Sequence, residues 1–323
     1  MQTIKLNKHK IKQKFIPFNY IFAAFIVFLI ICLISSPAKY INSATNGISL
    51  WVNNLVPALF PFFVLSKILM ELNVMEKFCK PLGKCMHTLF GTNANSSYIF
   101  FLSILSGYPL GSKLVLDAYN LKQINIVEAH RMVTFTSVSG PLFIIGTVGT
   151  TMLINQTCGY IIFISHIIGA FINGVLFRKY VPKGCDNLVT VKQTLQNQNK
   201  NKNILTDSIS SAINSILLIG GLVCIFYVGM EAVCSIVNLP NIVQGLFEIT
   251  NGCHLIANEI GLSIQIKTCL ACAIITFGGF CTHAQAMFFL KSIGISYSFF
   301  IKQKLVHTLC STLLCVVLCF IFL

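Results

Sequence analysis

Residues 98–119 read YIFFLSILSGYPLGSKLVLDAY. Two apolar pieces flank the motif SGYPLGSK, which contains two glycines, a proline and a lysine. Each apolar piece is about six or seven residues long, or roughly 10 Å as a helix, which reaches the middle of a bilayer without crossing it. Backbone groups in hydrocarbon must be hydrogen-bonded within the protein or to trapped water. The stretch therefore predicts a re-entrant hairpin or a broken helix.

The composition indicates that the rest of the chain also lies in a membrane. The 323 residues are 55% hydrophobic and 10% charged, whereas a soluble domain carries about 25% charged residues. Only residues 178–207 are polar enough for water, and they are too few for a soluble domain. We expect an all-α, polytopic membrane helix bundle, and the length accommodates roughly eight to ten spans of about 20 residues.

The formal charge of +14 would suggest a nucleic-acid ligand in a soluble protein. In an apolar chain, Lys and Arg instead gather at membrane edges, where they fix orientation and contact anionic headgroups. We therefore expect contact with membrane lipid and none with nucleic acid. The basic residues 1–14 and the basic linker at 179–207 are predicted to be cytoplasmic. The oligomeric state cannot be predicted from these features.

Apolar runs predict the spans, the first of them being a transmembrane helix at residues 15–37. Further spans are predicted at 48–72, 132–154, 158–177, 209–237 and 305–323. A second glycine break, ITFGGFCTHAQ at 275–285, interrupts another apolar run. Each break follows a long span and precedes a helix, and the first spans of the two halves enter from opposite sides. This layout predicts two inverted repeats, at 48–178 and 208–323, each with a broken or re-entrant segment.

Broken helices in both halves indicate a transport site near the membrane midplane. In the first break, small residues let the backbone approach a ligand, and these are Ser106, Gly107, Gly111 and Ser112. Lys113 adds a charge that would be costly in lipid. Two alternatives remain open: Lys113 extends its amine to the membrane surface, or the motif is a plain surface turn.

The second break has the same character. Gly278 and Gly279 supply flexibility, and hydrogen-bonding groups follow at Thr282, His283 and Gln285. A histidine there can be a neutral donor or a cation near neutral pH. The alternative is a core histidine that is satisfied by a backbone carbonyl.

Glu248 lies in the apolar stretch GLFEITNG, with Asn251 close behind. An acid among apolar membrane residues indicates function, such as binding a coupling cation or carrying a proton. The alternative is a glutamate at a helix end near water. The lysines of the second half leave the C-terminal topology open, and these are Lys267, Lys291, Lys302 and Lys304.

Other polar residues favour structural roles. His166, Gly169 and Asn173 recur on one helix face, a pattern typical of packing between membrane helices. Most of the 14 cysteines lie in apolar runs, where cysteine behaves as a small hydrophobe. Cys269 and Cys272 form a CxxC motif without a second pair nearby in the sequence, so we predict no metal site. Enzyme signatures such as HExxH, GxSxG and Walker A are absent, and we predict no enzymatic activity and no resident cofactor.

Three motifs together resemble the YlbJ-type sporulation integral membrane proteins: SGYPLGSK at 106–113, GLFEITNG at 245–252 and FGGFCTHAQ at 277–285. That family belongs to the nucleoside-recognition (Gate) group, which is similar in fold to concentrative nucleoside transporters. The resemblance covers most of the chain, from about residue 48 onward.

The resemblance implies a bacterial, multi-pass cell-membrane protein of spore formation, in the outer forespore membrane on the mother-cell side, with sporulation membrane partners. It implies transport or facilitated movement of dipicolinic acid toward the forespore. Dipicolinate is a small planar dianion, which suits half-helix N-termini with Lys113 or His283 and aromatic walls such as Tyr108 and Phe280. Transporters of this fold couple to sodium or protons, for which Glu248 and Asn251 are the candidates. A cation-coupled nucleoside transporter and a non-transporting scaffold for the spore envelope remain alternatives.

Overall fold

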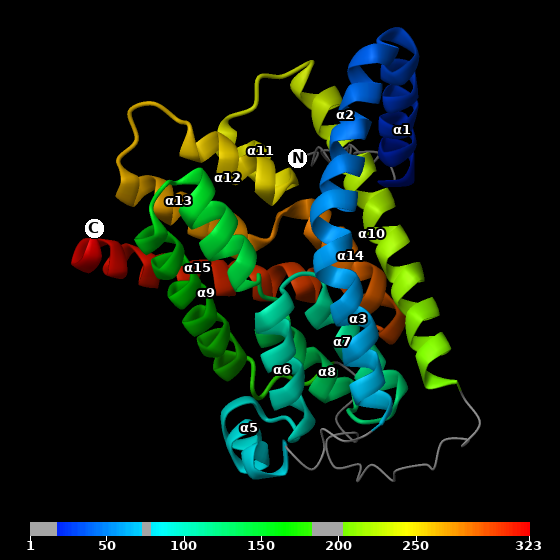
Figure 1. Cartoon of the computed structure of the whole chain (residues 1–323), viewed down its shortest axis with the longest axis vertical. Coiled ribbons are helices and arrows are strands. Elements are labelled where there is room, and N and C mark those ends of the chain that lie inside the picture. Colours follow the sequence, from blue (N-terminus) through cyan, green and yellow to red (C-terminus); the bar gives the residue numbers. More distant parts are fainter. Residues whose placement is uncertain (1–17, 73–78, 183–202) are drawn as a thin grey trace, which may run out of the picture.

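The computed structural model describes residues 18–72, 79–182 and 203–323, and these ranges form a bundle of helices without a strand (Figure 1). The predicted basic tail at 1–14 lies outside the described residues, as does most of the predicted linker at 179–207. The all-α prediction is confirmed for the described part of the chain.

The first half begins with two helices joined by a sharp bend and continues into a series of short ones. Its elements are α1 (Phe18–Ser35), α2 (Pro37–Leu50), the π-helical η1 (Trp51–Leu55), α3 (Val56–Glu71), η2 (Lys80–Leu82), α5 (Gly83–Phe90), α6 (Asn95–Ser106), α7 (Leu110–Asn120), α8 (Ile126–Thr136), the π-helical η3 (Leu142–Met152) and α9 (Gln156–Leu176).

The second half also alternates long and short helices. Its elements are α10 (Ile204–Cys234), α11 (Asn241–Phe247), α12 (Ile249–Ala257), α13 (Ile264–Phe277), α14 (Gly279–Leu290), η5 (Lys291–Ile293) and α15 (Tyr297–Phe322).

Local sequence explains several of the helix boundaries. At the start of α8, the Asn125 side chain accepts from the Glu128 amide and the Glu128 carboxylate accepts from the Asn125 amide, which satisfies two N–H groups at a helix start. Gly107 ends α6 with a φ of 82°, a backbone conformation that favours glycine. The helix break predicted at SGYP is confirmed.

The order of elements is the same in both halves. Each half has a long helix, a helical hairpin, an interrupted helix and a closing helix: α2–α3, α6–α7, α8–η3 and α9 in the first, and α10, α11–α12, α13–α14 and α15 in the second. The two long helices pack side by side in opposite directions (Figure 1), and the two closing helices pack on each other. This arrangement agrees with two inverted repeats.

The order of the helices shows that the breaks at Gly107 and Gly278 are not equivalent positions in the two repeats, although the sequence suggests that they are. The hairpin break at Gly107 corresponds in order to Glu248, and Gly278 corresponds to the segment at 137–141. The span predicted at 132–154 is interrupted there, and the span predicted from residue 48 starts at Pro37 instead. Gly140 and Pro141 in this segment indicate packing or a kink from sequence alone, and the structure shows a full interruption between α8 and η3.

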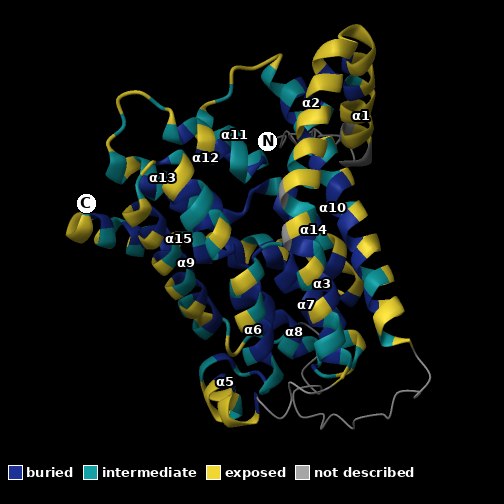
Figure 2. Cartoon of the chain, viewed as in Figure 1, coloured by how far each residue is buried: buried dark blue, intermediate teal, exposed yellow. Residues whose placement is uncertain are grey.

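The long closing helix α15 is polar on its inner face and apolar on its outer face. Its inner face is buried and comprises Lys304, His307, Ser311, Cys315 and Cys319, whereas its exposed face comprises Leu305, Leu309, Leu313, Val317 and Phe320. Figure 2 shows exposed residues along the outer helices, most densely on α1. A helix of a soluble protein has the reverse pattern, with its apolar stripe facing the core. This helix is therefore built for an apolar solvent, the bilayer.

Four described helical stretches are long and apolar enough to cross a membrane: Gln156–Leu176, Ile204–Cys234, Ile264–Ile293 and Tyr297–Phe322. The bent pair Phe22–Ser35 and Pro37–Asn53, with 111° between its helices, would make a fifth. The number is below the eight to ten that the chain length accommodates, because α6, α7, α8, α11 and α12 are each too short to span alone.

Candidate functional site

Tyr108 connects the two breaks that the sequence predicted. It lies between α6 and α7, and its hydroxyl is 3.3 Å from the Thr276 carbonyl oxygen and 3.4 Å from that of Ile275, in the last turn of α13. A side chain at Gly278 would come within 3.6 Å of the Tyr108 ring. The first break of one half is therefore in direct contact with the second break of the other.

Lys304 of α15 also contacts Tyr108 where the two breaks meet. Its amine donates a 2.5 Å hydrogen bond to the Tyr108 hydroxyl and a 3.2 Å bond to the Ser137 carbonyl oxygen. The amine also lies 4.8 Å from the centroid of the Tyr108 ring, within the range of a cation–π contact. The amine thus bonds to two interrupted segments, at Tyr108 and at 137–141, and Tyr108 connects them to the end of α13.

The Lys304 side chain has 0% exposure, and among the described residues no carboxylate forms an ion pair with it. Buried charges in proteins are normally paired. Helices α7 and α14 both begin at the breaks, and the positive ends of their dipoles add to the positive potential there. The site therefore combines a buried amine, without a carboxylate partner among these residues, with two helix N-termini.

Two histidines extend the polar centre along α9 and α15. The Nε2 atom of His166 accepts from the Ser139 amide at 2.8 Å, and its Nδ1 atom lies 2.9 Å from the Thr276 hydroxyl. His307 Nε2 lies 3.0 Å from the His166 carbonyl oxygen. These contacts tie the break at 137–141 to the end of α13, so that both are held by the closing helices.

The helix face of His166, Gly169 and Asn173 packs as predicted. A side chain at Gly169 would overlap the Ser311 side chain, which shows how closely α9 approaches α15. Asn173 donates to the Thr134 carbonyl at 2.7 Å and to the Gln303 side chain at 3.1 Å. The interpretation as a helix-packing stripe is confirmed, although His166 also reaches the polar centre.

His283 is buried beside the second break. Its Nε2 atom lies 2.7 Å from the Phe277 carbonyl oxygen and its Nδ1 atom lies 3.3 Å from the Tyr297 hydroxyl. The first contact matches the alternative of a core histidine that is satisfied by a backbone carbonyl. Gln285 is also buried, with its amide 3.4 Å from the Cys281 sulfur, and Thr282 is buried one turn before it.

Lys113 lies away from the Tyr108–Lys304 contact, in a separate charged cluster. Its amine is 2.9 Å from the Asp117 carboxylate and 3.2 Å from the Ser211 hydroxyl, and Lys67 lies 3.6 Å from the same carboxylate. With 3% exposure, Lys113 does not extend to the surface. Lys113 is paired with a carboxylate within the protein, so the structure offers Lys304 rather than Lys113 as the buried amine without a carboxylate partner in the described part of the chain.

The small residues of the first break allow close packing. The Ser106 hydroxyl bonds to the Leu102 carbonyl of its own helix. A side chain at Gly111 would overlap the Thr136 carbonyl oxygen, and one at Gly107 would overlap the Gly140 backbone. Ser112 is buried beside them. In the other half, Gly279 similarly packs against the Phe247 carbonyl, next to Glu248.

Glu248 is the break between α11 and α12. Its carboxylate accepts from the Thr250 amide at 3.0 Å and the Asn251 amide at 2.8 Å, which caps α12, and its exposure is 8%. The alternative from the sequence was a glutamate at a helix end near water. Glu248 does lie at a helix end, but it is buried. Glu248 and Asn251 line a cavity of about 270 Å³ together with Lys39, Asn42, Ser43, Asn46, Tyr227, Met230 and Glu231. The two predicted coupling residues are thus brought together in one polar cavity.

No family model and no solved structure matches the chain. A curated protein of Bacillus subtilis (strain 168), the sporulation integral membrane protein YlbJ, is 27% identical over 322 residues. The match covers 88% of this chain and 78% of the relative. The resemblance to YlbJ is confirmed. Similarity to YlbJ over this length, together with the membrane-adapted surface of α15, supports a multi-pass membrane protein related to spore formation proteins.

Sequence reasoning missed the central residue of this YlbJ-like chain. Lys304 appeared only as a lysine of uncertain topology, because a lysine near the start of a helix is typical of a membrane edge. A usable signal was the spacing of Lys304, His307 and Ser311, which places three polar residues on one face of an otherwise apolar helix. Thr276 and Ser137 carried no signal, since only the fold brings them to the amine.

Proposed function

We propose that the chain is a secondary transporter or facilitator of a small planar anion across a bacterial membrane, with dipicolinate as the candidate substrate. The proposal includes movement from the mother cell toward the forespore and a place in the outer forespore membrane. The YlbJ relative is a sporulation integral membrane protein, which supports the setting, and the resemblance supplies the candidate substrate.

The observation that carries the proposal is the buried amine of Lys304 where the breaks meet. An amine without a carboxylate partner in the described protein gains most from an anion that brings the missing charge. Two half-helix starts, at Leu110 and Gly279, face the same region, and Tyr108 offers an aromatic face for a planar ring.

In the mechanism that we propose, the structure is a closed state in which the Tyr108 hydroxyl occupies the hydrogen-bonding position on Lys304. Substrate carboxylate replaces the hydroxyl, and the Tyr108 ring turns to stack against the substrate. Because Tyr108 also holds the end of α13, its movement releases the contact between the two breaks. Access then alternates as one hairpin withdraws while the other stays in place.

The cavity at Glu248 supplies a candidate coupling site. Each carboxylate oxygen accepts one backbone hydrogen bond, so lone pairs remain for a cation or a proton. The side chains of Asn42, Asn46 and Asn251 line the same cavity and provide neutral oxygen ligands, the kind that hard cations prefer. Gly279 packs beside Glu248, so an ion there would bear directly on the second break.

The test is uptake of dipicolinate, with uridine as comparison, into liposomes that contain the purified protein, with and without sodium or proton gradients. Saturable dipicolinate uptake that is lost in Lys304→Met and kept in Lys302→Ala would support the proposal. Lys302 is the matched control because it lies on the same helix and is exposed. Equal uptake by the wild-type protein and Lys304→Met would contradict the role of the amine.

A cation-coupled nucleoside transporter is the second candidate, and the polar cavity at Glu248 favours it. Amide side chains and a carboxylate suit an uncharged, hydroxyl-rich ligand better than a dianion. Sodium-driven uridine uptake without dipicolinate uptake would select this candidate. If folded protein transports neither compound, the scaffold alternative gains instead.

A further inference from the structure

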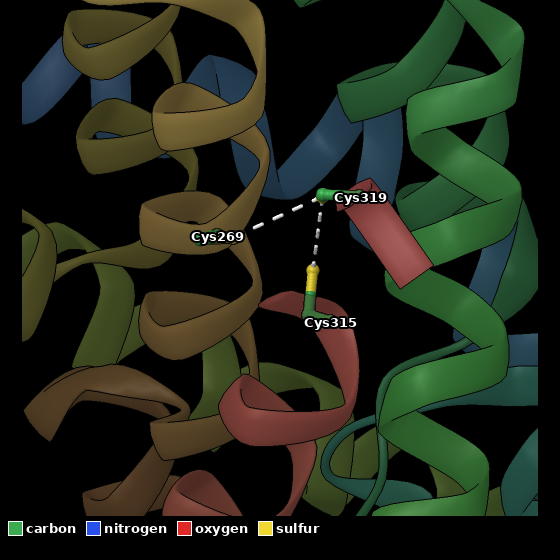
Figure 3. Close-up of side chains that lie close together, drawn as sticks. All are labelled: Cys269, Cys315 and Cys319. Carbon is green, nitrogen blue, oxygen red and sulfur yellow. Dashed lines mark hydrogen bonds between the residues drawn. The ribbon is translucent and has the colours of Figure 1, made fainter. Parts of the chain in front are cut away.

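The sequence shows one CxxC motif at Cys269 and Cys272, and the fold supplies the second pair that was missing. Cys315 and Cys319 lie one turn apart on α15 and face α13 (Figure 3). The thiol sulfur of Cys269 is 3.8 Å from that of Cys319, and the sulfurs of Cys315 and Cys319 are 4.0 Å apart. All three sulfurs lie within 4.8 Å of one another.

We propose that Cys269, Cys315 and Cys319 form a binding site for a soft metal ion that joins α13 to α15. Thiolates bound to one ion at about 2.3 Å lie roughly 3.8–4.0 Å apart in tetrahedral or trigonal geometry. The two separations that involve Cys319, 3.8 and 4.0 Å, fall in this range, and the third lies within 4.8 Å, so binding would need at most a small adjustment of the side chains. Thiolate ligands select ions such as Zn²⁺ or Cu⁺ over the hard cations.

The surroundings suit such an ion in two respects. Cys315 and Cys319 are buried and Cys269 is partly exposed, so the group is both shielded and reachable. Cys269 lies five residues after the start of α13 and Cys319 three residues before the end of α15, which places both within about 8 Å of a helix end. At those ends, the Gln265 side chain donates to the Leu323 carbonyl at 3.1 Å, so the two helix ends are already held together.

Binding is a simple exchange of protons for metal. Each thiol that becomes a ligand releases one proton, and the sulfur–metal bond replaces the sulfur–hydrogen bond without any change in oxidation state. The complex of a divalent ion with three thiolates has a net charge of −1, whereas the complex of a monovalent ion has a net charge of −2. Because net charge is costly in an apolar environment, Zn²⁺ is the better probe.

The consequence for the protein is a fixed distance between two elements of the polar centre. Helix α13 ends at Phe277 and helix α15 carries Lys304, and Tyr108 contacts both helices. A bound ion would hold the far ends of both helices together while the breaks move.

The experiment loads the full chain, purified under reducing conditions, with Zn²⁺ and counts the metal retained after desalting. We expect about one ion per chain, with loss of the ion in Cys315→Ala and Cys319→Ala. Cys253→Ala is the matched control, because it removes a buried thiol on α12 that is not part of the group. Loading with Cd²⁺ gives a second readout, since thiolate-to-metal absorbance scales with the number of sulfur ligands, and we expect three.

Cys269→Ser is the variant least expected to misfold, because Cys269 is only partly buried. The substitution also leaves both α15 thiols in place. It should lower the Cd²⁺–thiolate absorbance by about a third while the protein stays monodisperse. The proposal is overturned if the wild-type protein retains no more Zn²⁺ than a variant in which Cys269, Cys315 and Cys319 are all replaced by Ala. It is also overturned if mass spectrometry finds Cys269 and Cys319 joined as a disulfide in the reduced preparation. Neither outcome depends on whether the chain transports an anion.

Discussion

Lys304 and Tyr108 are 196 positions apart in the chain, and the lysine amine donates a 2.5 Å hydrogen bond to the tyrosine hydroxyl. This bond joins the closing helix of the second half to the hairpin of the first. Through the same hydroxyl, the hairpin contacts the Thr276 carbonyl at the end of α13. Tyr108 therefore connects the α6–α7 hairpin to α13 and α15. Alternating access would have to move these elements relative to one another.

Replacing Lys304 by Met should weaken anion uptake while keeping most of the side-chain volume. A hydrogen bond to a charged group contributes about 1.5–3 kcal/mol, so we expect a loss of about tenfold to a hundredfold in the apparent affinity for the anion. The measurement is concentration-dependent uptake of dipicolinate into liposomes. Lys302→Ala, two residues away and exposed, should behave like the wild-type protein, and a similar loss in both variants would count against a specific site.

Tyr108→Phe should disturb transport more than stability. The ring stays, but Lys304 loses an acceptor, and the contact with the Thr276 carbonyl is lost. We expect a destabilisation of about 1–3 kcal/mol together with a changed transport rate. The matched control is Tyr98→Phe, which removes another buried hydroxyl, one bonded to the Ser66 carbonyl. Thermal unfolding and uptake should separate the variants, since only Tyr108→Phe is expected to alter uptake per folded molecule.

Asp117→Asn should be strongly destabilising. It leaves Lys113 and Lys67 without their shared carboxylate, and removing one partner of a buried ion pair costs about 3–5 kcal/mol. The exposed pair Lys39–Glu231 provides the contrast, because breaking a surface pair costs about 1 kcal/mol or less. Unfolding midpoints of Asp117→Asn and Glu231→Gln give the comparison.

The double variant Lys113→Met/Asp117→Leu tests whether Lys113 is a substrate ligand. With both charges removed, stability should recover above that of Asp117→Asn, and anion selectivity should remain that of the wild-type protein. A folded double variant that no longer distinguishes anions would restore the sequence-based assignment of Lys113 to the substrate site.

Gly111→Ala should destabilise the protein by about 1–3 kcal/mol, the usual cost of overpacking, because the added methyl group would overlap the Thr136 carbonyl oxygen. Gly221→Ala is the control, since nothing lies within 4 Å of a side chain there. In the long helix α10 this change should be neutral or stabilising by up to about 1 kcal/mol. Equal unfolding midpoints for the two variants would contradict the close approach of α7 to α8.

Glu248→Gln should uncouple uptake from an ion gradient. The amide oxygen can still accept one of the two backbone hydrogen bonds, so the helix cap is partly kept, but the charge is lost. We expect exchange of substrate to continue while a sodium or proton gradient no longer drives accumulation. Glu259→Gln is the control, because Glu259 bonds to Asn241 at the other end of the same hairpin. A gradient-driven response that survives in Glu248→Gln would remove Glu248 from the coupling site.

The sequence was informative where a feature is encoded by neighbouring residues. The break at Gly107 was predictable because glycine and proline act locally on the backbone, and the packing face of α9 was predictable from helical spacing. The positions of α9 and α10 followed from long apolar runs. In each case the decisive residues lie within a few turns of one another.

Features that depend on distant contacts were not predictable. Whether Lys304 is buried depends on how α15 packs between α9 and the break at 137–141, which no local pattern specifies. Glu248 was recognised as unusual, but its role as a helix cap depends on where α11 ends. Likewise, Cys269 gained its partners only when α13 packed against a segment about fifty residues later in the chain.

The inward polar face of α15 also determines when the bundle can mature. This helix follows every other described element in the chain, so earlier segments must be synthesised and held in the membrane while the place of Lys304 is still unfilled. Water or a chaperone must solvate the carbonyl of Ser137 and the side chain of His166 during that interval, since neither is tolerated bare in hydrocarbon. The protein is therefore most vulnerable to degradation before α15 arrives, and substitutions on the inner face of α15 should lower cellular abundance in addition to any effect they have on activity.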